Sequence, residues 1–387
     1  MFSTLDSLDW KGLGYHTYSR HEEIPQAIRD LLSPDDAVRQ AARGFLLGEG
    51  QDFGDIYDTT PRIIPFCLEV LRADGAPGKA ELMQQLSGQG SYIARSETRS
   101  VHMMDLCLQT YAALRAGLDL YLDLLERGDR DERLAACELL QYMTDEPERL
   151  IPALLERVDR EADEAAQVSL LYCLKRLLGS LEWPRSPLKE KYAPHLRAMV
   201  EGHPSHTVRV AAARASAELA SQYRPRDRDL LSAQVAVLLA QEFLRPGPPM
   251  HWTEEYPSIH QENLVQDLAR LADPAPLLGL LAQAAITAEQ AHLLARGLLC
   301  QALIHRAQHP RHWQQMARFE RREEGDLYLF EHTLPPWQLK TEQVRSILQA
   351  VVAADRVWER PTNVFSYFYG LPDSREALRA LVEETRA

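Results

Sequence analysis

The chain has 387 residues, of which 45% are hydrophobic and 26% are charged, and its formal net charge at pH 7 is −13. This composition is typical of a folded chain that can bury a sizeable core. The acidic excess disfavours binding to a nucleic-acid backbone. It suits either a basic partner or solubility alone.

The sequence predicts no export signal and no membrane span. The first ten residues, MFSTLDSLDW, carry two aspartates where a secretory signal has basic residues and an apolar run. The longest apolar stretches, such as 277–304, are interrupted by Gln, Glu, His and Arg. The five cysteines lie far apart without a C-x-x-C pair, which favours reduced, buried thiols. We therefore expect a cytoplasmic protein.

The spacing of apolar residues is helical nearly throughout, and no convincing alternating segment lies between turn residues. We predict an all-α fold. Residues 23–32 and 33–46 form the first expected pair of helices. Further pairs are expected at 61–73 with 78–87, 118–127 with 130–143, 148–158 with 161–178, 188–201 with 205–222, 228–243 with 258–272, and 275–283 with 287–305.

The predicted pairs repeat at intervals of roughly 30 to 55 residues, the spacing of HEAT and armadillo arrays. A single hairpin cannot cover its apolar face, whereas stacked hairpins can. We therefore predict a right-handed α-solenoid of about seven HEAT-like hairpins over residues 1–305. The repeat signal fades beyond this range, and residues 306–387 are predicted to form an atypical helical C-terminal cap, continuous with the solenoid.

Three arginines occupy one position relative to pairs of alanines in the second helices. When DDAVRQAARGFL, RDERLAACELL and HTVRVAAARASAELA are aligned on those alanines, Arg39, Arg133 and Arg209 coincide. In the intervening unit the same alignment places Asp163 there. Alanines let two helices approach closely, and an adjacent arginine can reach a carboxylate or carbonyl of a neighbouring repeat. We predict a structural role for the three arginines, with ligand binding as the alternative.

Two segments interrupt the predicted repeats. Residues 88–101 combine Gly, Ser and charged residues and are expected to form an exposed loop. Residues 244–260 contain four prolines and are expected to lie across a solenoid face or project from one end. The second segment either covers the solenoid itself or binds a partner. Its candidate binding residues are Trp252, Glu254, Glu255 and Tyr256.

The stretches DAVRQAARGFL and TVRVAAARASAEL resemble the HEAT-repeat consensus. Residues 1–240 are similar to a group of poorly characterised bacterial HEAT-repeat proteins, although GEGQDFGD replaces the turn with histidine and glycine that the group usually has. The resemblance implies a helical scaffold, adaptor or inhibitor, and bacterial members can occur as immunity-type partners of toxins. The matching residues are Trp10, Tyr15, Tyr18, Pro25, Tyr57, Thr60, Pro65 and Phe66.

The sequence contains no common catalytic or phosphate-binding motif, since H-E-x-x-H, G-x-S-x-G and G-x-x-x-x-G-K are all absent. His305, His309 and His312 have helical spacing, but Pro310 interrupts that helix and no neighbouring Cys or Asp completes a ligand set. We expect no metal, no cofactor and no catalytic residue.

Three functional classes remain. The first is a non-enzymatic, monomeric solenoid that binds one protein partner, and its narrowest form is an immunity-type inhibitor or adaptor for a basic toxin or effector. The second is a nucleic-acid enzyme of the HEAT-like DNA glycosylase type, which needs a basic groove with a carboxylate flanked by aromatic residues. The third is a cofactor lyase or chaperone on a HEAT scaffold.

Overall fold

The fold is an α-solenoid, and helices are the only regular secondary structure in the residues that the computed structural model describes. The predicted all-α class is thereby confirmed. The chain divides into two compact units, Met1–Trp183 and Pro184–Ala387. The structure describes residues 1–12, 21–48, 56–94, 101–181, 187–219, 233–245, 264–265, 267–268, 275–283, 286–304, 342–359, 372 and 374–384.

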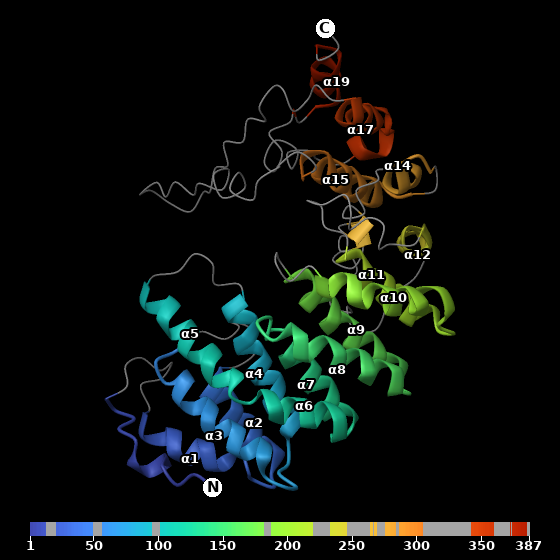
Figure 1. Cartoon of the computed structure of the whole chain (residues 1–387). Helices are drawn as coiled ribbons and strands as arrows, with labels where there is room; N and C mark the ends of the chain where they lie inside the picture. Colours follow the sequence, from blue (N-terminus) through green and yellow to red (C-terminus); the bar gives the residue numbers. More distant parts are fainter. Residues whose placement is uncertain are drawn as a thin grey trace, which may run out of the picture. The chain divides into compact units, whose positions relative to one another are not determined.

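The N-terminal unit is built from stacked helical hairpins in two layers (Figure 1). The second helices pack in succession, α2 on α4, α4 on α7 and α7 on α9, while α1 packs on α3 and α6 on α8 in the other layer. Short 3-10 turns at Leu5–Ser7 and His21–Glu23 precede these helices. The helices are α1 (Ile24–Asp30), α2 (Asp36–Leu47), α3 (Thr60–Arg72), α4 (Lys79–Ala94), α5 (Val101–Arg115), α6 (Leu118–Arg127), α7 (Arg130–Leu140), α8 (Pro147–Arg160) and α9 (Glu164–Gly179).

Helix α4 is longer than the sequence predicts. Residues 88–94 were expected in a loop, but they form the last turns of α4. A Cβ atom at Gly90 would lie 2.9 Å from Cδ2 of Tyr142, so this glycine permits a close approach to the residues that follow α7. Gly90, one of the residues that predicted a loop, instead allows α4 to pack closely against its neighbour. Residues 95–100 of the expected loop lie outside the described residues.

Four of the second helices begin with the same kind of cap. Asp35, Asp129, Asp163 and Ser205 precede α2, α7, α9 and α11, and each side chain accepts a hydrogen bond from a backbone amide of the first turn. At α7, Glu132 completes a capping box by returning a bond to the Asp129 amide. Such caps fix where each second helix starts, and each contributes about 0.5–2 kcal/mol.

Small residues fill the seams between helices of one hairpin. Ala135 and Ala136 of α7, which packs on α6, are fully buried, as are Ala211 and Ala212 of α11, which packs on α10. A larger side chain at such a seam would force the helices apart, and overpacking of this kind costs about 1–3 kcal/mol. The alanine pairs of the sequence thus mark helix contacts.

The first helices of several hairpins contain an internal proline that the predicted repeat did not use. Pro65 lies within α3, Pro152 within α8 and Pro194 within α10. A proline inside a helix removes one backbone hydrogen bond and bends the axis. An internal proline is thus a feature of three first helices, as an alanine pair is a feature of several second helices.

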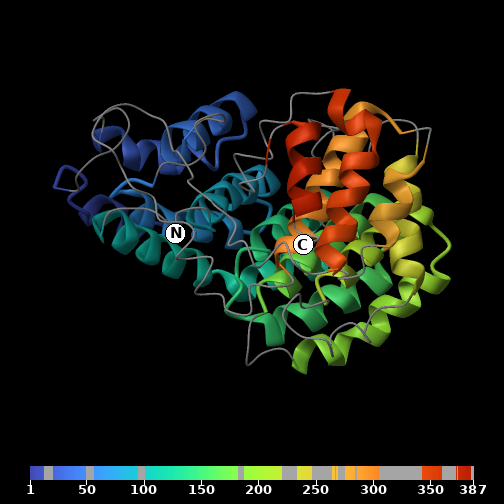
Figure 2. The ribbon, with the colours of Figure 1, turned by 90° about the horizontal axis from the view of Figure 1, so that it is seen from above.

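The C-terminal unit continues with packed helices, and Figure 2 shows its last helices, coloured orange to red, side by side. Contacts run from α10 to α11, α11 to α12, α12 to α14, α14 to α15, α15 to α17 and α17 to α19. The predicted boundary between residues 305 and 306 lies outside the described residues, which stop at residue 304 and resume at residue 342. The helices are α10 (Pro187–Gly202), α11 (His206–Ala217), α12 (Ala233–Leu244), α14 (Ala275–Leu281), α15 (Ala288–Ile304), α17 (Glu342–Ala353), the 3-10 helix η6 (Asp355–Glu359) and α19 (Arg375–Glu384).

Helix α11 is buried around its whole circumference, since every residue from Val210 to Ala217 is buried. This includes Arg214, whose side chain is 1% exposed and whose Nε lies 2.6 Å from Oδ2 of the fully buried Asp267. Two charges removed from water in this way require each other, because each alone would carry a large desolvation penalty.

The described cysteines Cys67, Cys107, Cys137 and Cys173 are free and buried. Burial raises the pKa of Cys67 to about 12, which keeps this thiol protonated. None of the described helices has the length and apolarity needed to cross a bilayer.

Candidate functional site

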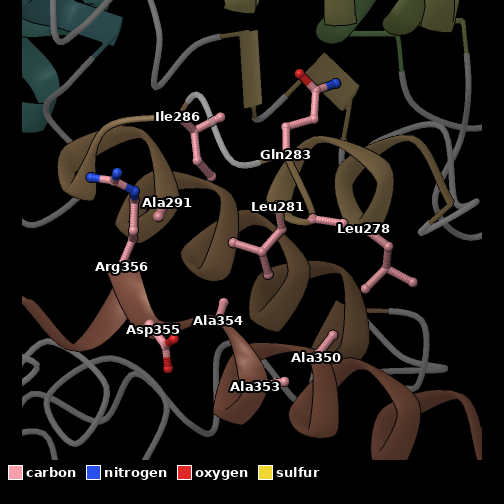
Figure 3. A pocket seen from close by; sticks show the side chains of 11 residues that line it. Leu278, Leu281, Gln283, Ile286, Ala291, Ala350, Ala353, Ala354, Asp355 and Arg356 are labelled. Carbon is pink, nitrogen blue, oxygen red and sulfur yellow. The ribbon is translucent and has the colours of Figure 1, made fainter.

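A pocket of about 470 Å³ lies among the helices of the C-terminal unit (Figure 3). Its size falls within the range of about 300–1,000 Å³ that is usual for ligand sites. Helices α14, α15 and α17, the residues between α14 and α15, and η6 supply its walls. The described lining residues are Leu278, Leu281, Ala282, Gln283, Ile286, Ala291, Ala350, Ala353, Ala354, Asp355 and Arg356.

The end of α17 creates the space. Ala350, Ala353 and Ala354 follow one another at helical spacing of three and four residues, so their methyl groups share one face. Figure 3 shows Leu281 and Leu278 of α14 on the other side of this space. Because alanines face leucines across it, the walls are apolar and the gap is not filled from the α17 side.

The charged residues of the pocket are tied to partners at its rim. Asp355, whose side chain is 81% exposed, forms an ion pair with Arg375 of α19, with 2.7 Å between Oδ1 and Nη2. Arg375 also donates from Nε to the backbone oxygen of Val352 at 2.7 Å. Arg356 lies 3.9 Å from Glu359. The polar side chains of the described lining are Gln283, Asp355 and Arg356, and the other eight residues are Leu, Ile or Ala, so most of the wall is suited to contact an apolar group.

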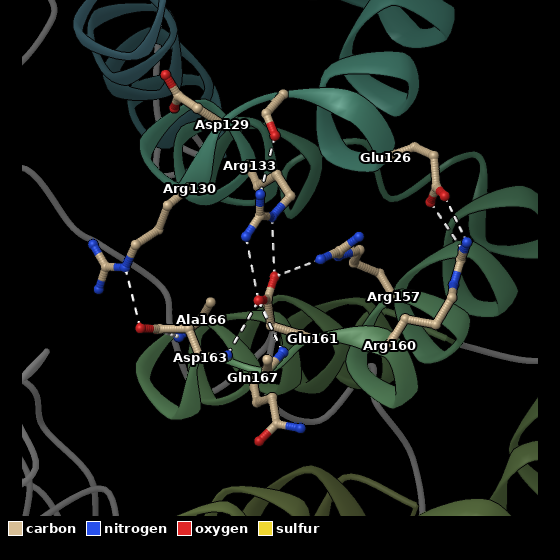
Figure 4. A network of polar contacts seen from close by, with 12 residues as sticks. Glu126, Asp129, Arg130, Arg133, Arg157, Arg160, Glu161, Asp163, Ala166 and Gln167 are labelled. Atoms are coloured by element: carbon tan, nitrogen blue, oxygen red, sulfur yellow. Dashed lines mark hydrogen bonds and ion pairs between the residues drawn. The ribbon is translucent and has the colours of Figure 1, made fainter.

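A second polar assembly lies where the α6–α7 hairpin meets the α8–α9 hairpin (Figure 4). Arg133 of α7 contacts both carboxylate oxygens of Glu161, with Nε at 3.0 Å and Nη2 at 3.2 Å. Its Nη1 donates to the backbone oxygen of Gly128 at 3.0 Å. Arg157 of α8 reaches the same carboxylate at 2.8 Å. One buried carboxylate therefore joins two neighbouring hairpins.

The ionisation of Glu161 is fixed by this assembly. Burial by itself would raise its pKa, but hydrogen bonds from Arg157, from the Asp163 amide and from Arg133 outweigh burial and lower the pKa to about 2. The amide of Ala162 adds a further bond at 3.1 Å. Glu161 is thus an anion at neutral pH, and both of its oxygens accept hydrogen bonds, which makes it a structural residue and a poor acid or base.

Two flanking ion pairs lie farther toward solvent. Arg160 contacts Glu126, with 2.5 Å between Nη1 and Oε1, and Arg130 lies 3.3 Å from Asp163. The amide of Ala166 and the charge of Arg130 lower the pKa of Asp163. Because these arginines are about half exposed, their ion pairs contribute little to stability.

The other two arginines of the predicted set contact their own hairpins. Arg39 donates from Nη1 to the backbone oxygens of Ser33 and Pro34 at 2.8 and 3.0 Å. Arg209 donates from Nε to the oxygen of Val200, in the last turns of α10, at 2.8 Å. The expected reach to a neighbouring repeat is therefore seen at Arg133 and is not among these contacts of Arg39 and Arg209.

The intervening hairpin corrects the predicted alignment. Asp163 precedes α9 as its cap, and the fourth residue of α9 is Gln167. Arg39, Arg133 and Arg209 are likewise fourth in their helices. Gln167 donates to the backbone oxygen of Val158 at 3.3 Å, so it takes the same place as the arginines. The alanine pair of α9 lies one turn earlier than in the other helices, which misled the alignment.

The predicted binding residues and the histidines considered as metal ligands lie outside the described residues: Trp252, Glu254, Glu255, Tyr256, His305, His309 and His312. In the part of the chain that is described, no group of three or more His, Cys, Asp or Glu side chains has a metal-binding arrangement.

Comparison with known proteins gives a family for neither unit. No known protein family matches the chain, and no curated protein does. Among solved structures, an engineered protein is similar over 94% of this chain and 99% of its own, with 12% identity and a TM-score of 0.40.

Two further solved structures are also similar at 12% identity. A chain of the Kap95:Nup1 complex matches 95% of this chain with a TM-score of 0.41, and importin beta matches 95% with a TM-score of 0.43. This chain spans 52% and 55% of their lengths. These likenesses concern the arrangement of helices and do not indicate what the chain binds.

Sequence analysis missed the pocket and Glu161. The run AVVAAD at 350–355 was a usable signal, because alanines at positions three and four apart near a helix end leave a small-residue face. Glu161 stands two residues before a cap, where no common motif places a structural carboxylate.

Proposed function

We propose that the chain is a non-enzymatic helical-repeat protein that binds one protein partner, as a monomer. The observation that carries this proposal is the pocket between α14, α15, α17 and η6, whose described walls are mostly Leu, Ile and Ala and whose single carboxylate, Asp355, is paired with Arg375. Such a pocket supplies contact area and shape without groups that could activate a substrate.

An apolar side chain of the partner is the proposed occupant. Binding energy in protein interfaces concentrates in anchors that fill well-packed pockets, surrounded by residues that exclude water. Burying one large apolar side chain contributes about 1.5–3 kcal/mol. The ion pair between Asp355 and Arg375 stands at the border of the pocket, where it can form part of a polar rim.

The partner is proposed to be basic. The net charge of −13 would accelerate association with a positively charged protein and make the association rate fall with added salt. The narrowest form of the proposal is an immunity-type inhibitor or adaptor for a basic toxin or effector. Trp252, Glu254, Glu255 and Tyr256 are proposed to add contacts, and Arg39, Arg133 and Arg209 to be structural.

A pocket-filling variant tests the proposal once a partner has been captured from the native source and purified. Ala353 is exposed at the last turn of α17, so Ala353→Trp can block the pocket without disturbing the core. We expect the variant to raise the Kd for the partner at least about tenfold, because an anchor of about 1.5–3 kcal/mol is excluded. Titration calorimetry measures the change.

Gln349→Trp is the matched control, since Gln349 is exposed on the same helix and does not line the pocket. It should leave the Kd unchanged. Equal affinity of both variants would contradict the proposed site. A small molecule that co-purifies with the wild type and is lost from Ala353→Trp would contradict the protein partner and favour the cofactor alternative.

A further inference from the structure

Helix α5 departs from the two-layer arrangement of the N-terminal unit. It packs against α3 and α4 and lies at the edge of the unit in Figure 1. Its inner face buries Leu106, Thr110 and Leu114. The outer face carries Leu108, whose residue is 64% exposed, an unusual exposure for a leucine in a regular helix. The outer face of α5 therefore combines an exposed leucine with the polar residues Asp105, Gln109 and Arg115.

Leu108 begins an apolar stripe that leads into a second pocket. Ala112, and Ala116 directly after the end of α5, follow at intervals of four residues and are both exposed, so they continue the face that Leu108 begins. They also line a pocket of about 400 Å³. We call the stripe and this pocket the α5 surface. The residues that line the pocket are Ala112, Arg115, Ala116, Leu118, Asp119, Glu146 and Arg149.

Among the described residues at the border of the α5 surface, carboxylates outnumber cations. The arginines are Arg115, which lies 3.0 Å from Asp145 and also contacts Glu146, and Arg149, which lies 2.5 Å from Asp119.

A fourth carboxylate, Asp105, is exposed on α5 one turn before Leu108. The hydroxyl of Tyr111 donates to Asp145, and burial together with this bond raises the pKa of Tyr111, so the phenol stays neutral. Four carboxylates and two guanidiniums leave the border with an excess of negative charge.

We propose that the α5 surface binds an amphipathic helix that carries Lys or Arg beside its apolar stripe. The proposal rests on the chain being a protein-binding protein and names a partner element for the N-terminal unit. Leu108 supplies an apolar contact, while the alanines let a second helix backbone approach closely. The acidic border complements basic residues that flank the apolar face of the ligand.

Three matched peptides of about 18 residues, long enough to form helices, are the probes. The first has a Leu stripe at helical spacing flanked by Lys and Arg. The second keeps the stripe and replaces the basic residues with Glu, and the third keeps the basic composition but scatters the leucines. The full-length chain should bind the first peptide at least tenfold more tightly than either of the others, measured by fluorescence anisotropy.

Leu108→Asp should weaken binding of the basic amphipathic peptide at least tenfold. Val237→Asp is the control, because Val237 is also an exposed apolar residue, 53% exposed on α12 in the other unit, and it should have no effect. Circular dichroism confirms that both variants are folded. Equal binding of all three peptides, or equal binding to wild type and Leu108→Asp, would overturn the proposal.

The same assay separates this inference from the proposed function. Ala353→Trp alters the pocket of the C-terminal unit and should leave peptide binding at the α5 surface unchanged. Loss of partner binding in Ala353→Trp with no selective peptide binding would support the pocket and refute the α5 surface. Selective peptide binding with an unchanged partner Kd in Ala353→Trp would support the α5 surface and refute the pocket.

Discussion

The two units of the chain bury charge in different ways. In the N-terminal unit Glu161 is buried, but Arg133 and Arg157 around it remain 19% and 13% exposed and the backbone supplies further bonds. In the C-terminal unit Arg214 and Asp267 are both essentially inaccessible. Glu161 has several partly exposed partners, whereas Arg214 and Asp267 are both removed from water. Loss of one partner should therefore cost less stability at Glu161 than at the Arg214–Asp267 pair.

The buried pair should give the largest effect. Arg214→Met removes the guanidinium that pairs with the buried Asp267 carboxylate, and removal of one partner of such a pair costs about 3–5 kcal/mol in free energy of unfolding. Urea denaturation measures it. The double variant Arg214→Met with Asp267→Leu should recover most of the loss, since neither charge of this pair then remains buried. A single-variant cost under about 1 kcal/mol would show that the pair is not essential.

Glu161→Gln should give an intermediate effect of about 2–3 kcal/mol, because the neutral amide leaves Arg133 and Arg157 without their counter-charge. The pKa of Glu161 is about 2 in the folded chain, below the value of about 4.3 expected when unfolded. Its stabilising contribution is therefore complete above the unfolded pKa and is lost as the pH falls through the folded one.

The stability difference between wild type and Glu161→Gln should accordingly shrink as the pH falls from about 5 towards 2. Denaturation at a series of pH values measures it. A difference that does not change over this range would show that the carboxylate is not held as an anion.

Glu126→Gln should give the smallest effect. It breaks the ion pair with Arg160 beside the Glu161 assembly, and both of its side chains are about half exposed. Pairs of this kind contribute about 0–1 kcal/mol and weaken with salt. A cost equal to that of Glu161→Gln would mean that exposure does not decide which charges hold the hairpins together. Parallel urea denaturation at low and high salt distinguishes the two.

The sequence predicts much of the hairpin framework because local signals define it. A capping residue followed by a polar side chain at the fourth helix position recurs at Arg39, Arg133 and Arg209, and the hydrogen bonds of these arginines to backbone oxygens span nine residues or fewer. Aligning on alanines alone misplaced this position at Asp163. Caps are the safer landmark, since they fix the helix start itself.

Other features depend on residues far apart in the chain, and the sequence alone could not place them together. Arg214 and Asp267 are 53 positions apart, and the pocket combines α14 with α17. Gly90 belongs to the Gly- and Ser-containing composition that predicted a loop, whereas in the structure it lies in α4 close to Tyr142 of another hairpin. In each case the structure depends on packing between distant segments, which local composition does not reveal.

The proposed binding surfaces of both units arise where helices stop covering one another. Leu108 is exposed because α5 has no further helix on its outer face among the described residues, and the pocket remains because α17 ends in alanines. Regular hairpins elsewhere use their apolar residues for stacking. Recognition is therefore expected at these two places.

Hydrogen–deuterium exchange of the full chain with and without its purified partner tests this claim most directly. Binding should slow exchange at the end of α17 and η6, residues 350–356, and along α5, residues 105–116, while α11, whose helical bonds are already buried, should change little. Protection confined to the turns around Gly128 and Glu161, with none at either surface, would contradict the account.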